Sequence, residues 1–342
     1  MRDLMDTAYW LSVEDHIMAS PPKTSGKRYL LLWRVKPCIV IGKNQIAEAE
    51  IDLAEAARRN IAITRRGSGG GAVYQDPGSI QYSVIQPHSN KYSDDAMKIA
   101  REQVAECIAG ALRKFGVAAV AEGRNDITVN GAKVSGLSQL ARGGWLNTHG
   151  TLLYDADLEI LSKLLIPDSE KYLSKAVRSV RKRVANVRPM ITVQLGTGAD
   201  SVESFVSEFE NAVREDASAH GRPFAEFRPA PGDIANIMKI REEIYTNPAN
   251  IFESSPPYTF RNARRFPQGR IEFFAEVKGG IVASCAIRGD FIGAITVDAL
   301  ERALTGAPFQ SDAFSVALCG DIVKNALGGL EKADFLDLLF GH

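Results

Sequence analysis

A glycine-rich loop followed by β-type residues is the feature that most constrains the fold of this 342-residue chain. The loop reads Arg65-Arg66-Gly67-Ser68-Gly69-Gly70-Gly71-Ala72-Val73-Tyr74, with four glycines in five positions. Glycine accepts positive φ and lets a ligand approach the main chain, so such a loop can turn several N–H groups toward an anion or a developing oxyanion. A hairpin or bulge that binds nothing explains the same glycines equally well.

The glycine spacing formally matches the dinucleotide-binding pattern, as Gly67-x-Gly69-x-x-Ala72. That pattern needs a helix to begin at the loop, whereas Val73-Tyr74 is β-prone and Pro77-Gly78 breaks the chain soon afterwards. No Gly-Lys-Ser/Thr follows, which excludes a Walker A loop. The sequence therefore predicts a non-helical backbone nest between two strands.

Composition excludes several classes of function. Lys+Arg and Asp+Glu balance at 41 each, so bulk charge predicts neither nucleic-acid binding nor a general attraction to membranes. The four cysteines are scattered without a C-x-x-C pair, which fits a reducing compartment and excludes the common zinc patterns. No apolar run approaches the roughly 18–20 residues that span a bilayer, and the acidic start has no signal-peptide character. We expect a cytoplasmic protein.

Hydrophobic periodicity predicts a mixture of helices and strands. Expected helices cover residues 6–18, 51–59, 93–115, 158–165, 203–213, 233–243, 297–304, 312–327 and 332–340. Expected strands cover residues 29–34, 38–41, 61–64, 73–74, 79–86, 117–120, 127–135, 145–153, 271–277 and 281–287. A Pro/Gly-rich change in composition places a linker at about residues 245–253, between a large domain over 1–245 and a small domain over 252–342.

A second candidate site centres on Lys133. Two short apolar runs flank Asn130-Gly131, which predicts a tight type I′ hairpin over residues 127–135. Strand alternation predicts two faces, one with Lys133 and Ser135 and the other with Ala132 and Val134. A lone strand lysine is usually a solvated surface residue, but an ammonium fixed by a hairpin can neutralise a phosphate or an oxyanion.

Other residues near these motifs add weaker signals. The run Gly123-Arg124-Asn125-Asp126 brings a carboxylate to the mouth of the hairpin, and Asp126 is suited to hold Mg²⁺ beside phosphates. His149, within an expected strand, is by itself more often a hydrogen-bonded core residue than a catalyst. No cysteine is near it in sequence and no G-x-S-x-G elbow occurs, which argues against acyl-cysteine and Ser–His mechanisms. The basic run at residues 178–183 is either a solvated face or a rim for an acidic partner.

Taken together, the motifs resemble the lipoate–protein ligase A family. The glycine loop, residues 123–126 with Lys133-Val134-Ser135-Gly136, and His149-Gly150-Thr151-Leu152-Leu153 occur in the family's order and at its separations. Trp33-Arg34, Val40-Ile41-Gly42 and residues 179–186 resemble further family segments. Residues 264–266, 269–272, 278–281 and 289–293 resemble its accessory domain. The resemblance implies an α+β fold, with a large mixed α/β domain of the type shared with biotin–protein ligase catalytic domains and a small C-terminal α+β domain.

The resemblance also implies roles for individual residues. Lys133 is implied to be the essential catalytic lysine, touching the α-phosphate and the activated carbonyl. The implied ATP and acyl-adenylate contacts are Arg66, Gly71, Ala72, Val73, Tyr74, Asn125, Asp126 and Lys133. The implied lipoyl contacts are Ser68, Gly69, Gly70, Lys133 and His149, and Asp126 is implied to meet Mg²⁺. Gln75 departs from the histidine usual in the family, and residues 246–255 match its interdomain segment only loosely.

The implied reaction is ATP- and Mg²⁺-dependent activation of lipoate to lipoyl-AMP. Transfer of the lipoyl group to a lysine of an acceptor domain follows, on an E2 subunit of a 2-oxoacid dehydrogenase or on the glycine cleavage H protein. Alternatives are an octanoyl or lipoyl transferase of the same superfamily and a catalytically idle paralogue that binds lipoyl groups. A biotin ligase is less favoured because no Arg-Gly-Arg-rich adenylate loop occurs.

Overall fold

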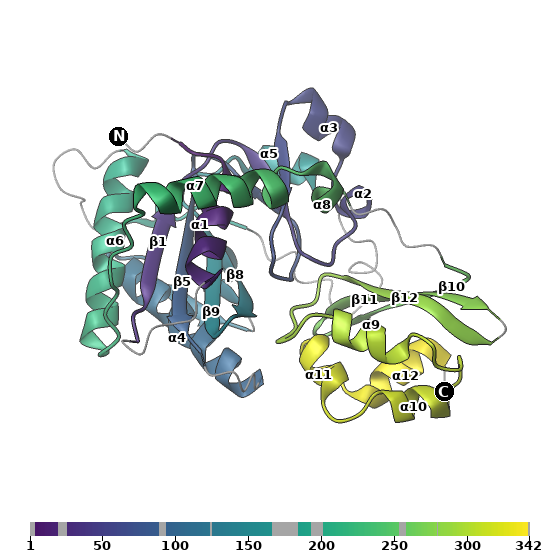
Figure 1. Ribbon diagram of the computed structural model, residues 1–342. Coiled ribbons are helices and arrows are strands. Elements are labelled where there is room, and N and C mark those ends of the chain that lie inside the picture. Colours follow the sequence, from purple (N-terminus) through teal and green to yellow (C-terminus); the bar gives the residue numbers. More distant parts are fainter. Residues whose placement is uncertain are drawn as a thin grey trace.

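The computed structural model describes residues 4–19, 26–88, 94–123, 125–165, 184–192, 201–252, 258–278 and 280–340 (Figure 1). An N-terminal body (described residues 4–252) and a C-terminal body (described residues 258–340) each have their own sheets and apolar core. The larger body combines parallel and antiparallel strand pairs with helices, and the smaller has one antiparallel sheet with helices. The predicted α+β class is confirmed.

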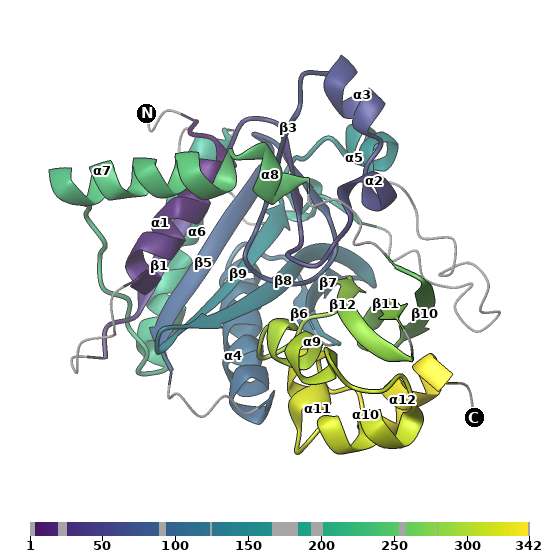
Figure 2. The ribbon, with the colours of Figure 1, turned by 45° about the vertical axis from the view of Figure 1, so that its right-hand side comes forward.

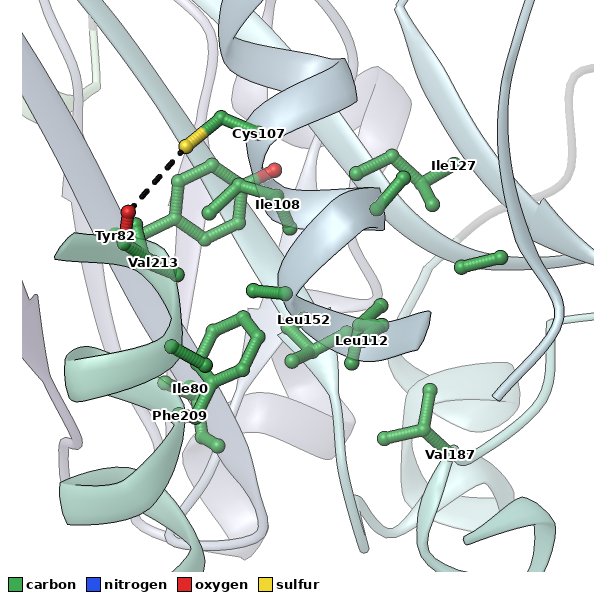
Figure 3. Close-up of a cluster of buried hydrophobic side chains, with 14 of the residues drawn as sticks. Ile80, Tyr82, Cys107, Ile108, Leu112, Ile127, Leu152, Val187, Phe209 and Val213 are labelled. Carbon is green, nitrogen blue, oxygen red and sulfur yellow. Dashed lines mark hydrogen bonds between the residues drawn. The ribbon is translucent and has the colours of Figure 1, made fainter. Parts of the chain in front are cut away.

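A six-stranded antiparallel sheet organises the N-terminal body. Its order is β1 (Tyr29–Trp33), β5 (Ser79–Pro87), β9 (Trp145–Leu153), β8 (Ala132–Arg142), β7 (Asp126–Val129) and β6 (Ala119–Glu122). Helices α4 (Asp94–Arg113) and α6 (Val202–Ala219) cover one face of this sheet, where Ile80, Leu112, Leu152 and Phe209 pack together (Figure 3). The opposite face lies toward α1 (Thr7–Ala19), whose apolar residues pack with Leu31 and Ile85.

A small mixed sheet carries the glycine loop. Strand β2 (Cys38–Ile41) pairs in parallel with β3 (Ala62–Arg65) and antiparallel with β4 (Val73–Gln75). Residues 66–72 connect β3 to β4 without a helix, as the sequence predicted. The short helices packed against this sheet are α2 (Ala47–Glu50), α3 (Leu53–Arg58) and α5 (Leu158–Leu164). The single helix predicted over 51–59 is wrong at its start, because Ile51 is extended between α2 and α3.

The hairpin between β7 and β8 has the predicted turn and an unpredicted bulge. Asn130 and Gly131 have φ of 51° and 76°, the positive pair that a type I′ turn requires. Ile127 pairs with Ser135 but Thr128 pairs with Lys133, so Val134 is an extra residue on β8. Strand alternation is therefore broken, and the prediction that Lys133 and Ser135 share a face is wrong. Ser135 lies opposite core residues, and its hydroxyl is 2.8 Å from the Tyr82 hydroxyl.

The segment leaving the N-terminal body packs against β3. Helix α7 (Pro231–Ile240) continues through the π-helical turn η4 (Arg241–Tyr245) to α8 (Pro248–Ile251), and η3 (Arg188–Met190) precedes α6. The Arg65 guanidinium donates to the Asn250 and Ile251 carbonyls, at 3.0 and 2.6 Å. Part of the predicted 245–253 linker is thus fixed to the end of β3.

The C-terminal body is a three-stranded antiparallel sheet with four short helices below it (Figures 1 and 2). The strands are β10 (Phe260–Phe266), β11 (Gly269–Lys278) and β12 (Ile281–Gly289), and the helices are α9 (Asp298–Leu304), α10 (Ser311–Ala317), α11 (Ile322–Ala326) and α12 (Lys332–Phe340). The helix predicted over 312–327 is wrong, because the chain turns at Gly320 (φ 58°) between α10 and α11. Strand β10 was not predicted.

Among the residues that the structure describes, two backbone hydrogen bonds join the bodies. The Gly70 N–H donates to the Phe291 carbonyl at 3.2 Å, and the Gly289 N–H donates to the Asn44 carbonyl at 2.9 Å. The glycine loop therefore forms part of the contact between the bodies. In the described ranges, no helix combines the length and apolar character that a bilayer crossing demands.

Candidate active site

A cavity of about 280 Å³ lies between the glycine loop and the α1-facing side of the main sheet. Nine of the predicted site residues line it, namely Arg66, Gly70, Gly71, Ala72, Val73, Tyr74, Asn125, Lys133 and His149. Ser68, Gly69 and Asp126 are not among its lining residues, but each contacts a residue that is, namely His149, Arg66 and Lys133 respectively. The structure therefore gathers residues from four separate sequence segments around one space. Arg124 and residues 178–183 lie outside the described residues.

Lys133 is held in place from three sides. Its ammonium Nζ is 2.8 Å from Asp126 Oδ1, and its carbonyl accepts the Ala185 N–H at 3.0 Å. A Cβ built on Gly136 would lie 2.8 Å from Nζ, so glycine leaves the space that the lysine side chain occupies. The side chain is still 32% exposed. A cation fixed in this way can meet a phosphate or a developing negative charge from the cavity.

The Arg66 guanidinium supports the glycine loop from within. It donates to the carbonyls of Val40 (3.2 Å), Gly69 (2.6 Å) and Gly71 (2.8 Å), and to the Ser68 hydroxyl (3.1 Å). Burial lowers the pKa of Arg66 to about 10, and the neighbouring Arg65 charge acts in the same direction. The loop carbonyls converge on this cation, and the Gly70 N–H is engaged by Phe291. The predicted anion nest is thus partly occupied by contacts within the protein.

His149 belongs to a buried chain of polar groups. Its Nε2 is 2.7 Å from the Ser68 hydroxyl, and its Nδ1 is 3.1 Å from a carboxylate oxygen of Glu14 on α1. The Ser83 hydroxyl also donates to Glu14. Because a carboxylate oxygen accepts, the ring nitrogen that faces Glu14 is placed to donate, and Nε2 faces the Ser68 hydroxyl. The chain fixes the ring orientation at the cavity wall.

Gln75, the departure from the family pattern, is also fixed. Its carbonyl oxygen accepts from the Thr7 hydroxyl at 2.8 Å, and its amide donates to the Thr151 hydroxyl at 3.3 Å. All three residues line the cavity. Both polar atoms of this neutral amide therefore have a hydrogen-bond partner.

Sequence reasoning missed several residues of the site. Thr7, Glu14 and Gln81 lie outside the motifs singled out in the sequence. The pairing of β1, β5 and β9 and the packing of α1 bring Thr7 and Gln81 to the cavity lining and Glu14 to the His149 ring. Trp33 belongs to a segment that resembles the family but had no predicted site role, and it also lines the cavity. One signal was available for Glu14, because the helix predicted over 6–18 is apolar on most sides. A carboxylate in such a helix is expected to be buried, and a buried carboxylate needs hydrogen-bond or ion-pair partners.

Comparison with known proteins identifies the family. The family model described as the lipoyl protein ligase A/B catalytic domain matches residues 6–211. The model described as the bacterial lipoate protein ligase C-terminus matches residues 255–339. The chain belongs to the lipoate–protein ligase family. The family inferred from the sequence motifs is confirmed.

Individual lipoate–protein ligases match over nearly their whole length. Lipoate-protein ligase LplJ of Bacillus subtilis is 33% identical over 314 residues, covering 92% of this chain and 91% of the relative. Lipoate–protein ligase 1 of Staphylococcus aureus is 29% identical over 337 residues, covering 98% of each chain. Both bodies are therefore shared with these relatives.

Solved structures agree with this assignment. A P. falciparum LipL1 structure in complex with lipoate has a TM-score of 0.73 at 21% identity, covering 97% of this chain and 95% of its own, which shows a common fold. A bipartite lipoate protein ligase of Thermoplasma acidophilum, described with its E2 lipoyl domain, has a TM-score of 0.61 at 25% identity. That match covers 75% of this chain and 97% of the other.

Proposed function

We propose that this protein activates lipoate with ATP to form lipoyl-AMP and pyrophosphate, and then transfers the lipoyl group to a lysine of an acceptor domain. Relatives named lipoate–protein ligases that span nearly the whole chain support this reaction. The observation that carries it is the position of Lys133, which lines the cavity beside the glycine loop with its ammonium held by Asp126. Lipoyl domains of E2 subunits and the glycine cleavage H protein are the proposed acceptors.

The proposed chemistry follows from these groups. A carboxylate is a poor acyl donor until adenylation gives it a good leaving group. Attack at phosphorus and later at the acyl carbon places negative charge on oxygen, and a fixed ammonium at Lys133 is suited to stabilise that charge. The acceptor supplies the attacking lysine amine, so the ligase needs no covalent nucleophile of its own. The apolar acyl chain fits the side of the cavity lined by Leu11 and Trp33.

Asp126 is the proposed contact for Mg²⁺. No cluster of three or more His, Cys, Asp or Glu side chains suited to a metal occurs in the part of the chain that the structure describes. Mg²⁺ is usually bound by one or two carboxylates together with phosphates and water, so the single carboxylate of Asp126 beside Lys133 fits a metal that arrives with ATP. The metal would supply charge neutralisation at the phosphates.

The cysteines argue against the transferase alternative. An acyl-cysteine mechanism needs a thiolate at the cavity, and none of the four cysteines lines it. Burial raises the pKa of the Cys107 thiol to about 12, and the thiol donates to the Val213 carbonyl in the core (Figure 3). Burial raises the pKa of Cys38 to about 12 as well. Cys285 and Cys319 belong to the C-terminal body.

We also retain the proposed division into a catalytic domain over 1–245 and an accessory domain over 252–342. The separate apolar cores of the two bodies support it. The hydrogen bonds from Arg65 to Asn250 and Ile251 favour a boundary toward the C-terminal end of the 245–253 linker.

Lipoate-stimulated ATP–pyrophosphate exchange tests the function. The wild-type chain should exchange label only when lipoate is present, whereas an ATP-independent transferase or an idle binding protein should show no exchange. Lys133→Ala should abolish lipoyl-AMP formation. Lys114→Ala, which removes an exposed lysine paired with Glu215 outside the cavity lining, is the matched control. Near-normal lipoyl-AMP formation by Lys133→Ala would remove the role assigned to this lysine.

A further inference from the structure

The Arg65 guanidinium joins two segments that are far apart in the sequence. Arg65 is the last residue of β3 and is 9% exposed. Its Nη1 group donates to the Gly42, Lys43 and Gln45 carbonyls, at 3.0, 3.0 and 2.6 Å. Its Nε and Nη2 groups donate to two carbonyls at the end of α8. One buried side chain therefore holds both the loop at residues 42–45 and the segment that leads to the C-terminal body.

The 42–45 loop contacts the glycine loop on one side and the C-terminal body on the other. Toward the glycine loop, the Lys43 N–H donates to the Ser68 carbonyl at 2.8 Å. Toward the C-terminal body, the Asn44 carbonyl accepts the Gly289 N–H at 2.9 Å. The position of this one loop therefore affects both contacts.

Ser68 connects the 42–45 loop to the cavity wall. The Ser68 hydroxyl is 2.7 Å from Nε2 of His149, which lines the cavity. The same hydroxyl accepts from Arg66 Nε at 3.1 Å. The hydrogen bond from Lys43 holds the Ser68 main chain, so a shift of the 42–45 loop would move this hydroxyl relative to the His149 ring.

We propose that Arg65 is a positioning residue of the ligase site and that it acts through the 42–45 loop. Arg65 keeps the Ser68 hydroxyl beside His149, at the proposed lipoyl-binding wall of the cavity, and keeps the Asn44 carbonyl at the contact with the C-terminal body. Arginine suits this role because its planar guanidinium donates in several directions, whereas lysine presents a compact ammonium. This proposal rests on the proposed function.

Arg66 provides the competing explanation. It donates to the Gly69 and Gly71 carbonyls, and the Ser138 hydroxyl also donates to Gly69. If these contacts alone hold the glycine loop, the loss of Arg65 lowers stability without changing lipoate binding. The two explanations therefore predict different KM values for lipoate in variants of Arg65.

Arg65→Lys gives the primary test, because it keeps the positive charge and removes the guanidinium. The KM values for lipoate and for ATP are measured separately, by lipoate-dependent ATP–pyrophosphate exchange. We expect the KM for lipoate to rise about tenfold, as the loss of one hydrogen bond that orients Ser68 implies. The KM for ATP should stay near its wild-type value. Arg58→Lys is the matched control, since Arg58 is an exposed arginine of α3 that pairs with Glu55.

Chemical rescue separates positioning from a general loss of structure. Arg65→Ala removes the guanidinium, and added methylguanidinium can donate to the same carbonyls. We expect methylguanidinium to bring the lipoate KM of this variant back toward the wild-type value. Methylammonium, which carries the charge without the planar donors, should not do so.

Hydrogen exchange tests the same contacts on the wild-type chain. Lipoate binding should slow exchange of the Lys43 amide, because a ligand held beside Ser68 stabilises the hydrogen bond between these two residues. In Arg65→Lys, the Lys43 and Gly289 amides should both exchange faster than in wild type, since they donate on opposite sides of the 42–45 loop.

Four results would overturn the proposal. They are an unchanged lipoate KM in Arg65→Lys, an equal rise of the KM values for lipoate and ATP, equal rescue by the two added cations, and unchanged exchange of the wild-type Lys43 amide when lipoate binds. The last measurement needs no variant, so misfolding of the Arg65 variants does not prevent the test. Failure of the proposed function looks different, because the wild type would then bind no lipoate or show no lipoate-dependent pyrophosphate exchange.

Discussion

Replacing Gly69 by alanine should detach the C-terminal body from the glycine loop. A Cβ at this position would lie closer than 3.0 Å to the Phe291 carbonyl oxygen and 3.3 Å from Ile292 Cα. The loop cannot retreat easily, since the Gly69 carbonyl is held by Arg66 at 2.6 Å and by the Ser138 hydroxyl at 2.9 Å. The C-terminal body therefore has to move.

The expected cost has two parts. Overpacking of this kind costs about 1–3 kcal/mol, and losing the hydrogen bond from Gly70 to Phe291 costs about 0.5–1.5 kcal/mol. A sum of about 1.5–4.5 kcal/mol corresponds to a docking constant lowered roughly 10- to 2000-fold. Gly71→Ala is the matched control, because a Cβ there meets no atom within 4 Å.

Hydrogen exchange measures this effect directly. The Gly70 and Gly289 amides both donate across the contact between the bodies, so their exchange should accelerate by about the same factor in Gly69→Ala. Amides within β8 and β11 should keep wild-type protection in both variants. Unchanged protection of Gly289 in Gly69→Ala would refute the reasoning, because this amide is not part of the mutated loop and donates across the contact between the bodies.

Two further predictions concern buried groups. Glu14→Ala leaves the His149 ring and the Ser83 hydroxyl without their acceptor, and should lower the unfolding free energy by about 2–4 kcal/mol. Glu14→Gln should lose much less, and equal losses in urea unfolding would contradict the assigned hydrogen bonds. Burial raises the pKa of Cys38 and Cys107 to about 12, whereas unfolded thiols ionise near about 8.5. The folded chain therefore binds these two thiol protons more tightly than the unfolded chain does. Their contribution to the unfolding free energy is complete below about pH 8.5 and falls as pH rises toward about 12. Between pH 9 and 11 (roughly the window set by these values) the unfolding free energy should fall more steeply in wild type than in a Cys38→Ala, Cys107→Ala variant. Equal slopes would argue against buried neutral thiols.

Local signals in the sequence were sufficient for much of the fold. Asn130-Gly131 specified the turn by itself, because few residue pairs accept two positive φ values. The apolar stripe of α4 predicted that helix within about two residues of each end. The family resemblance, rather than a local signal, placed the glycine loop and Lys133 in one site, and both line the cavity.

Features that depend on distant partners could not be predicted. The bulge at Val134 has no local signal, and it moved Ser135 to the core face. Strand β10 carries three arginines, and only its pairing with β11 makes it a strand. The Arg66 guanidinium donates to carbonyls of β2 and of its own loop. These hydrogen bonds depend on the conformation of the loop, which the sequence does not show. The hydrogen bond between Glu14 and His149 joins residues that are 135 positions apart in the sequence.

The Gly70 peptide takes part in two equilibria, the binding of a ligand in the cavity and the docking of the C-terminal body. Gly70 lines the cavity, and its amide donates to the C-terminal body. Linkage between such equilibria is reciprocal. If docking raises the affinity of a cavity ligand by some factor, saturation with that ligand must strengthen docking by the same factor. Occupancy of the cavity is therefore readable at a residue outside the cavity lining, as the exchange rate of a single amide at Gly289.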